Sequence, residues 1–139
     1  MAYAARQDLA DRFGADEIDE LAPESGNRGA AALADADAEI DAALAAAYDL
    51  PLSGTFPVLK AVACDLARLR LYDDAVPPEA VLGRANRSRA RLREIADGKS
   101  ALVDSDGGLV DRRIETGPPL GARQEAPAAR LTREKLKGY

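Results

Sequence analysis

The stretch FPVLKAVACDLARLRLY, residues 56–72, carries the strongest fold signal in the chain. Its apolar side chains recur at steps of three and four residues, which places them on one face of an α-helix. These side chains are Leu59, Val62, Ala63, Leu66 and Leu69. Pro57 suits the first turn of a helix, because that turn needs no amide donor. The stretch therefore predicts a helix over residues 57–73 with one face in a core.

Similar spacing recurs on both sides of this stretch. Upstream, a helix over residues 30–48 is expected, with Leu33, Ile40, Leu44 and Ala47 on one face. Downstream, a helix beginning near Pro78 and ending before Gly98 is expected, and its core face holds Val81, Ala85, Ser88, Leu92 and Ile95. Two short helical segments are predicted over residues 7–13 and 16–21. The short connections favour antiparallel neighbours, so we expect an all-α fold, a small antiparallel helical bundle over residues 1–98.

The composition changes after Gly98. Two Leu-Val pairs, at residues 102–103 and 109–110, flank the turn sequence DSDGG, which predicts a short β-hairpin over residues 99–116. Residues 117–139 contain GPPLG and APAA and are predicted to form an extended linker and C-terminal arm.

The composition predicts a thin core. Alanine supplies 30 of the 139 residues, whereas Leu, Ile, Val and Phe together supply 29. Stability is therefore expected to depend partly on partners. No apolar run approaches the roughly 18 residues of a membrane span, and the start of the chain lacks the basic-then-apolar order of a signal peptide. We expect a soluble, intracellular protein with no membrane partner.

The absence of histidine excludes several kinds of chemistry. The chain has no His and one cysteine, Cys64, so His-dependent triads, the usual zinc ligand sets and an intramolecular disulfide are excluded. The acidic run at residues 35–41 is interpreted as a solvated helix surface rather than a metal site. We therefore predict a protein that is not an enzyme and that uses no cofactor and no metal.

Charge is distributed unevenly along the chain. Residues 1–59 hold 12 acidic and 3 basic side chains, whereas residues 60–139 hold 12 acidic and 16 basic ones. Copies of such a chain could stack head to tail in a ring, because unlike faces would meet. The side chains that could make such subunit contacts are Arg84, Arg87, Arg91, Asp35 and Glu39.

The arginine run at residues 84–93 supports an alternative function. Five guanidiniums within ten helical residues could lie along phosphates, as in a helical nucleic-acid-binding or regulatory protein. However, the arginines straddle the predicted core face, the sequence pI is about 4.8, and no aromatic residue lies among them for base stacking.

The C-terminal residues are suited to docking on another protein, because basic and apolar side chains alternate there. The predicted docking residues are Arg130, Leu131, Arg133, Leu136, Lys137 and Tyr139.

Several stretches together resemble a family of small virion proteins. These are MAYA (residues 1–4), QDLADRFG (7–14), ADAEIDAALAAAYDLPL (36–52), LKAVACDLARLRLYD (59–73) and TREKLKGY (132–139). In order and spacing they are similar to the head–tail connector, or adaptor, proteins of Mu-like tailed phages and prophages.

The resemblance implies a structural role in the phage neck. It implies a ring, typically of twelve copies, on the outer end of the portal protein, where it extends the DNA channel. The next neck component, a stopper or tail terminator, would bind the ring, and packaged DNA would pass through without specific binding. The C-terminal arm would contact the portal or adjacent subunits, while Asp37 and Asp41 could face the channel. The expected location is the virion neck, and the host bacterial cytoplasm during assembly.

Overall fold

The computed structural model describes residues 1–73 and 75–113 of the chain. Helices in this part are α1 (Arg6–Phe13), α2 (Ala15–Leu21), α3 (Arg28–Leu44), α4 (Pro57–Leu71) and α5 (Glu79–Ala96). The described residues form no β-strand, which confirms the expected all-α class for them. None of these helices combines the length and the apolar character that crossing a membrane requires.

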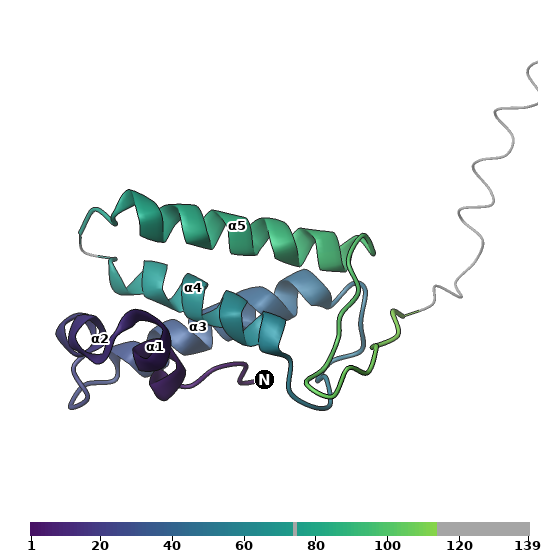
Figure 1. Cartoon of the computed structure of the whole chain (residues 1–139), viewed down its shortest axis with the longest axis horizontal. Helices are drawn as coiled ribbons and strands as arrows, with labels where there is room; N and C mark the ends of the chain where they lie inside the picture. Colours follow the sequence, from purple (N-terminus) through teal and green to yellow (C-terminus); the bar gives the residue numbers. More distant parts are fainter. Residues whose placement is uncertain (74, 114–139) are drawn as a thin grey trace, which may run out of the picture.

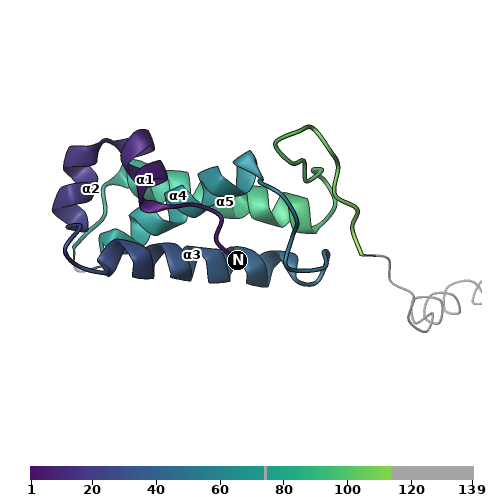
Figure 2. The ribbon, with the colours of Figure 1, turned by 90° about the horizontal axis from the view of Figure 1, so that it is seen from below.

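The three long helices form the body of the molecule. α4 packs against both α3 and α5, and each of the three runs antiparallel to the next along the chain (Figure 1). The short helices α1 and α2 lie together at one end, where α1 packs on α4 and α3 (Figure 2). The predicted antiparallel helical bundle is therefore confirmed.

The central position of α4 explains why its buried face is wider than the predicted stripe. Its buried side chains are Leu59, Val62, Ala63, Cys64, Leu66, Ala67 and Leu71. The prediction was wrong for Leu69, which is only partly buried. Because α4 packs against α3, α5 and α1, it buries more than one stripe of side chains, and the buried face includes Cys64 and Leu71.

Alanine contributes to the core through small contacts between α3 and α4. Ala32 and Ala36 of α3 are buried, as are Ala63 and Ala67 of α4. Small side chains allow two helix backbones to approach closely, so the backbones themselves take part in the packing. An alanine-rich chain can in this way bury a core that contains few large side chains.

The predicted core faces of the other two long helices are confirmed. All five predicted residues of α5, from Val81 to Ile95, are buried. The predicted face at residues 33–47 is buried as well, although α3 ends at Leu44 and Ala47 lies in the turn beyond it. Burial of a side chain such as Leu92 is worth about 1.5–3 kcal/mol, so these stripes are the main source of stability.

The predicted β-hairpin over residues 99–116 is not supported. Among its described residues, Val103 and Leu109 form one isolated antiparallel bridge instead of paired strands. The amide of Ser105 donates to the carbonyl of Thr55 at 2.8 Å, and Leu102 is fully buried in the helical core. These contacts with the rest of the molecule hold the segment as a turn, so a longer strand ladder does not form.

Candidate functional site

A groove runs along α4 and α5. It encloses about 400 Å³ and is lined by Val58, Ala61, Val62, Asp65, Arg84, Arg87, Ser88 and Arg91. A second hollow of about 330 Å³ shares Val58 and Arg91 with it and continues toward Ile95 and Val103. The groove thus has an apolar floor from α4 and a wall of three arginines from α5.

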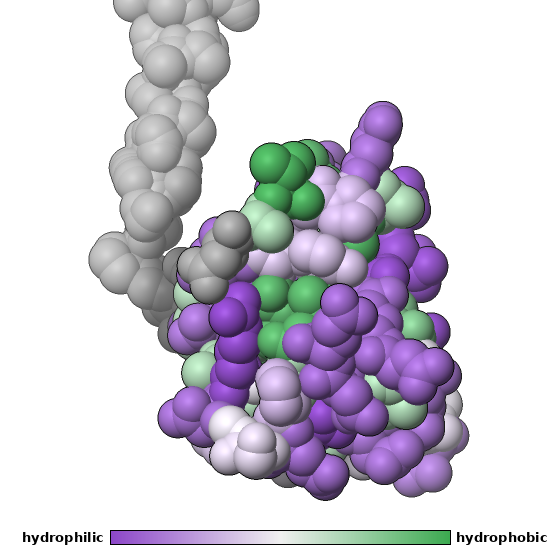
Figure 3. Space-filling model, turned by 90° about the vertical axis from the view of Figure 1, so that its left-hand side faces the viewer, coloured by the Kyte–Doolittle hydropathy of each residue, from purple (hydrophilic) through white to green (hydrophobic). Residues whose placement is uncertain are grey.

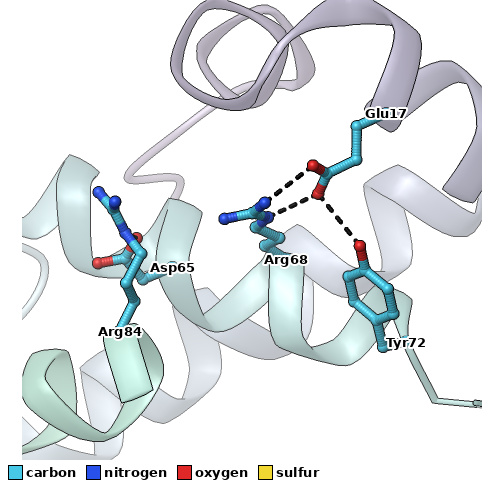
Figure 4. Close-up of polar contacts among 5 residues, drawn as sticks. All are labelled: Glu17, Asp65, Arg68, Tyr72 and Arg84. Carbon is cyan, nitrogen blue, oxygen red and sulfur yellow. Dashed lines mark hydrogen bonds and ion pairs between the residues drawn. The ribbon is translucent and has the colours of Figure 1, made fainter. Parts of the chain in front are cut away.

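Three of the residues that line the groove, Asp65, Arg84 and Ser88, contact one another. Arg84 Nε lies 3.3 Å from Asp65 Oδ1, and the Ser88 hydroxyl donates to Asp65 Oδ2 at 2.7 Å. Figure 4 shows Arg84 extending from α5 to Asp65 on α4. The charge of Arg84 is thereby balanced inside its own subunit.

Arg87 and Arg91 are the groove arginines that have no partner among the residues that the structure describes. Both side chains are exposed, and neither makes a hydrogen bond or ion pair with residues 1–73 or 75–113. They are four residues apart on α5, so they lie on the same side of the helix, one turn apart. Of the predicted contact arginines, these two present free charge.

The opposite flank of α5 uses its arginine to hold the bundle together. Arg89 donates to Glu39 of α3 at 2.6 and 3.3 Å, and Arg70 of α4 donates to the same carboxylate at 2.7 Å. Hydrogen bonds from Arg89 and then Arg70 hold the pKa of Glu39 below its usual range, despite partial burial. Glu39, a predicted subunit contact, is thus bound by side chains from two other helices of its own subunit, α4 and α5.

A second charged cluster fixes α2 to α4. Arg68 binds Glu17 through two hydrogen bonds of 2.6 and 2.8 Å, and the Tyr72 hydroxyl donates to Glu17 at 3.4 Å (Figure 4). The hydrogen bonds from Arg68 lower the pKa of Glu17. The guanidinium of Arg68 also lies 4.2 Å from the centre of the Phe13 ring, which favours a cation–π contact. The sequence analysis did not identify this cluster, because its members are scattered along the chain.

The predicted channel-facing acids, Asp37 and Asp41, bind the start of the chain. The Tyr3 amide donates to Asp37 at 3.1 Å, the Tyr3 hydroxyl donates to Asp41, and the amino terminus lies 3.4 Å from Asp41. Burial raises the pKa of Asp37, and burial together with the Asp41 contact raises the pKa of Tyr3 well above its usual range. A channel-facing role stays a prediction. The sequence-based predictions did not include Tyr3, although the chain has few aromatic side chains, four tyrosines and two phenylalanines.

Asp35 differs from its acidic neighbours. It is exposed and lines a hollow of about 270 Å³ with Arg28 and Arg70, between α3 and α4. It accepts no hydrogen bond from a residue that the structure describes. Its predicted role in subunit contacts is untested.

The end of the described chain is anchored to the end of α3. The Arg113 guanidinium donates to the carbonyls of Ala45 and Tyr48, both at 2.8 Å, and to Asp49 at 3.0 Å. These contacts hold Arg113 beside the start of the α3–α4 connection. The predicted docking residues 130–139 lie outside the described residues.

In a chain without histidine, only cysteine and carboxylate side chains could bind a metal ion in the usual way, and only Cys64 could supply a thiol. No group of three or more potential metal-binding side chains occurs in residues 1–73 and 75–113. Cys64 is fully buried, and burial raises the pKa of its thiol to about 11. A protonated, inaccessible thiol is a structural residue rather than a nucleophile.

Exposed apolar side chains occur at the end of the molecule that carries α2. Val76 is 92% exposed and Leu82 41% exposed, at the connection between α4 and α5 and the first turns of α5. Figure 3 views this end and shows small hydrophobic groups set in a mostly hydrophilic surface. A surface of this kind is suited to contacts that combine charge with limited apolar burial.

The comparisons with known proteins gave one family. The model of the family described as Bacteriophage Mu, Gp36 matches residues 3–114, which include every helix from α1 to α5. No curated protein matches the chain.

Proposed function

The chain belongs to the Bacteriophage Mu Gp36 family, and from this premise we propose that it is a head–tail connector that forms a ring beneath the phage portal. The resemblance to a Mu-like phage family is thereby confirmed. Membership of this family makes the chain a Mu-like phage protein and suggests a structural or morphogenetic role.

The observation that carries the proposal is the extent of the family match. It spans residues 3–114, so it takes in the whole described bundle as one unit and not a single motif within it. Ion pairs at Glu17, Glu39 and Asp65 join the helices of the bundle to one another. A subunit whose own fold is fixed in this way can act as a rigid building block in an assembly.

The anchored end of the bundle supports a docking role for the residues that follow. Arg113 fixes the chain beside the end of α3, after which 26 more residues extend to Tyr139. The proposed docking residues, Arg130 to Tyr139, begin 17 positions beyond that anchor. We expect them to bind the portal or a neighbouring copy, in a ring of about twelve copies whose other face receives the next neck component.

Nucleic-acid binding by residues 84–93 is less well supported by the geometry. Arg84 and Arg89 are paired with Asp65 and Glu39, so their charges are partly neutralised within the subunit. The groove lining also includes the Asp65 carboxylate and no aromatic side chain on which a base could stack. Arg87, Arg91 and Arg93 remain exposed and without a partner among the described residues, fewer than the phosphate contacts of proteins that bind DNA tightly.

Deletion of this protein from its phage tests the proposal. A connector is needed to join heads to tails, so the deletion should yield DNA-filled or leaking heads and separate tails in electron micrographs. The protein should also be found by mass spectrometry in purified complete particles, at about the copy number of the portal. Complete particles that form without it, or that lack it, would contradict the proposal.

A further inference from the structure

We infer that the Arg87/Arg91 pair in the α4–α5 groove binds Asp16 and Glu20 on α2 of a second copy of this chain. The inference rests on the proposed function, because it names the contact by which copies would join in the ring. It also names which side chains would meet between copies, which the uneven distribution of charge along the chain does not decide.

In the described part of the chain, four arginines of α4 and α5 form ion pairs within the subunit. Arg68, Arg70, Arg84 and Arg89 each contact a carboxylate at 3.3 Å or less. On α5, this leaves Arg87 and Arg91 as unpaired arginines whose side chains line a groove. Arg93 is also exposed and unpaired, but it does not line the groove.

On α2, too, some acidic side chains form ion pairs within the described fold and others do not. Glu17 binds Arg68, and Asp19 binds Arg6 at 2.8 Å. Asp16 and Glu20 are exposed and make no hydrogen bond or ion pair with residues in the described ranges. They are four residues apart on one helix, so their carboxylates lie on one side of α2, one turn apart.

The two free pairs are therefore complementary in both charge and spacing. Arg87 and Arg91 present two guanidiniums one helical turn apart, and Asp16 and Glu20 present two carboxylates at the same interval. Side chains one turn apart on a helix have Cβ atoms roughly 5–6 Å apart, so two parallel ion pairs can form at once. The adjoining groove floor, Val58 and Ala61, adds apolar surface that α2 would cover.

The two surfaces lie on different parts of one subunit. The α2 helix is at the end of the bundle beside the α4–α5 connection, while the groove runs along α4 and α5 (Figures 1 and 2). A contact between unlike surfaces is heterologous, and repeating it gives a closed ring when the rotation between copies closes. The same contact can thus be made by every copy.

Charge reversal on each surface, alone and in combination, tests the inference. In the full-length chain carrying R87E and R91E, both the groove and α2 are acidic. In the chain carrying D16K and E20K, both surfaces are basic. We expect each variant alone to lose at least about tenfold in self-association constant, because like charges now meet. An equimolar mixture of the two should recover association, because each surface then finds its opposite.

The measurement is sedimentation equilibrium at low salt, where charge contacts are strongest, over a range of protein concentrations. The variant R93E/K99E is the matched control, since it makes the same change in net charge outside the groove and should leave association unchanged. D16N/E20Q is a milder variant that should weaken association without placing lysines near the start of α2. Circular dichroism confirms that each chain is folded.

The outcomes separate this contact from the proposed function. Wild-type protein that does not associate under any of these conditions would overturn the inference, as would a mixture that fails to recover association. Binding of duplex DNA that is lost in R87E/R91E while self-association is unchanged would also overturn it, by assigning the groove to phosphates. Each of these failures is compatible with a connector found in phage particles, so the deletion experiment decides the proposed function independently.

Discussion

The two flanks of α5 carry the same residue type and use it differently. Arg89 faces α3 and α4 and binds Glu39 at 2.6 Å, so its charge helps to hold three helices together. Arg87 and Arg91 face the groove and have no partner among the residues that the structure describes. The arginine run therefore contributes to the fold through Arg89, while the Arg87/Arg91 pair is available for the contact with a second copy that we propose. Substitutions on the two flanks should therefore separate stability from assembly.

The largest effect is expected between the flanks, in the buried stripe of α5. Leu92 is 2% exposed, so Leu92→Ala should lower the free energy of unfolding by about 2–5 kcal/mol through lost burial and a cavity. Urea denaturation followed by circular dichroism measures this change. A loss below about 1 kcal/mol would show that α5 packs loosely, and the contrast between its flanks would lose its basis.

The next largest effect is expected at the carboxylate shared by the folding flank. Arg70 and Arg89 are partly buried, and Glu39→Ala removes the carboxylate that accepts their hydrogen bonds. The substitution should therefore lower the free energy of unfolding by about 1–3 kcal/mol. Asp35→Ala is the matched control, because Asp35 lies one turn away on α3 and is exposed. Equal effects of the two substitutions in the same urea titration would contradict the assigned role of Glu39.

The acidic partners of the arginines predict a pH dependence. The pKa values of Glu17 and Glu39 are lowered in the folded state, so their ion pairs stabilise the fold above the ordinary glutamate pKa. That stabilisation is lost as the pH falls through the lowered folded-state values. The stability difference between wild type and E17Q/E39Q should therefore shrink from about pH 5 to about pH 3. A difference that stays constant in thermal melts over this range would contradict the assignment.

The smallest effect on stability is expected on the groove flank. R87A/R91A should change the free energy of unfolding by no more than about 0.5 kcal/mol, since neither side chain has a partner in the described fold. Arg89→Ala should cost about 1 kcal/mol, because it breaks two hydrogen bonds to Glu39. If the ranking is reversed in calorimetry, the division between the two flanks is wrong.

Helix positions could be predicted from the sequence because periodicity reports burial directly. The predicted face of α5, from Val81 to Ile95, is buried at every position. The stripe on α4 was only partly predicted, because α4 packs against α3, α5 and α1, and no local pattern indicates that so many helices surround it. The hairpin prediction failed for a related reason, since Leu102 is held by the core of the bundle.

The charged partners could not be predicted, because they join distant positions. Arg89 and Glu39 are 50 residues apart, and Arg68 and Glu17 are 51 residues apart. A chain with 19 basic and 24 acidic residues offers many pairings, and only the packing of the helices selects among them. The sequence did identify Arg87 and Arg91 as candidate contacts, but it grouped them with Arg84 and Glu39, which the fold uses internally.

Binding to the purified portal ring of the same phage tests the central claim most directly. Native mass spectrometry would compare the full-length chain with a chain ending near Gln124, which lacks the proposed docking residues. The account predicts that full-length protein loads in a multiple matching the portal, about twelve copies, and that the truncated chain does not load. Failure of both chains to bind the portal would contradict the connector assignment, and equal loading of both would contradict the role of residues 130–139.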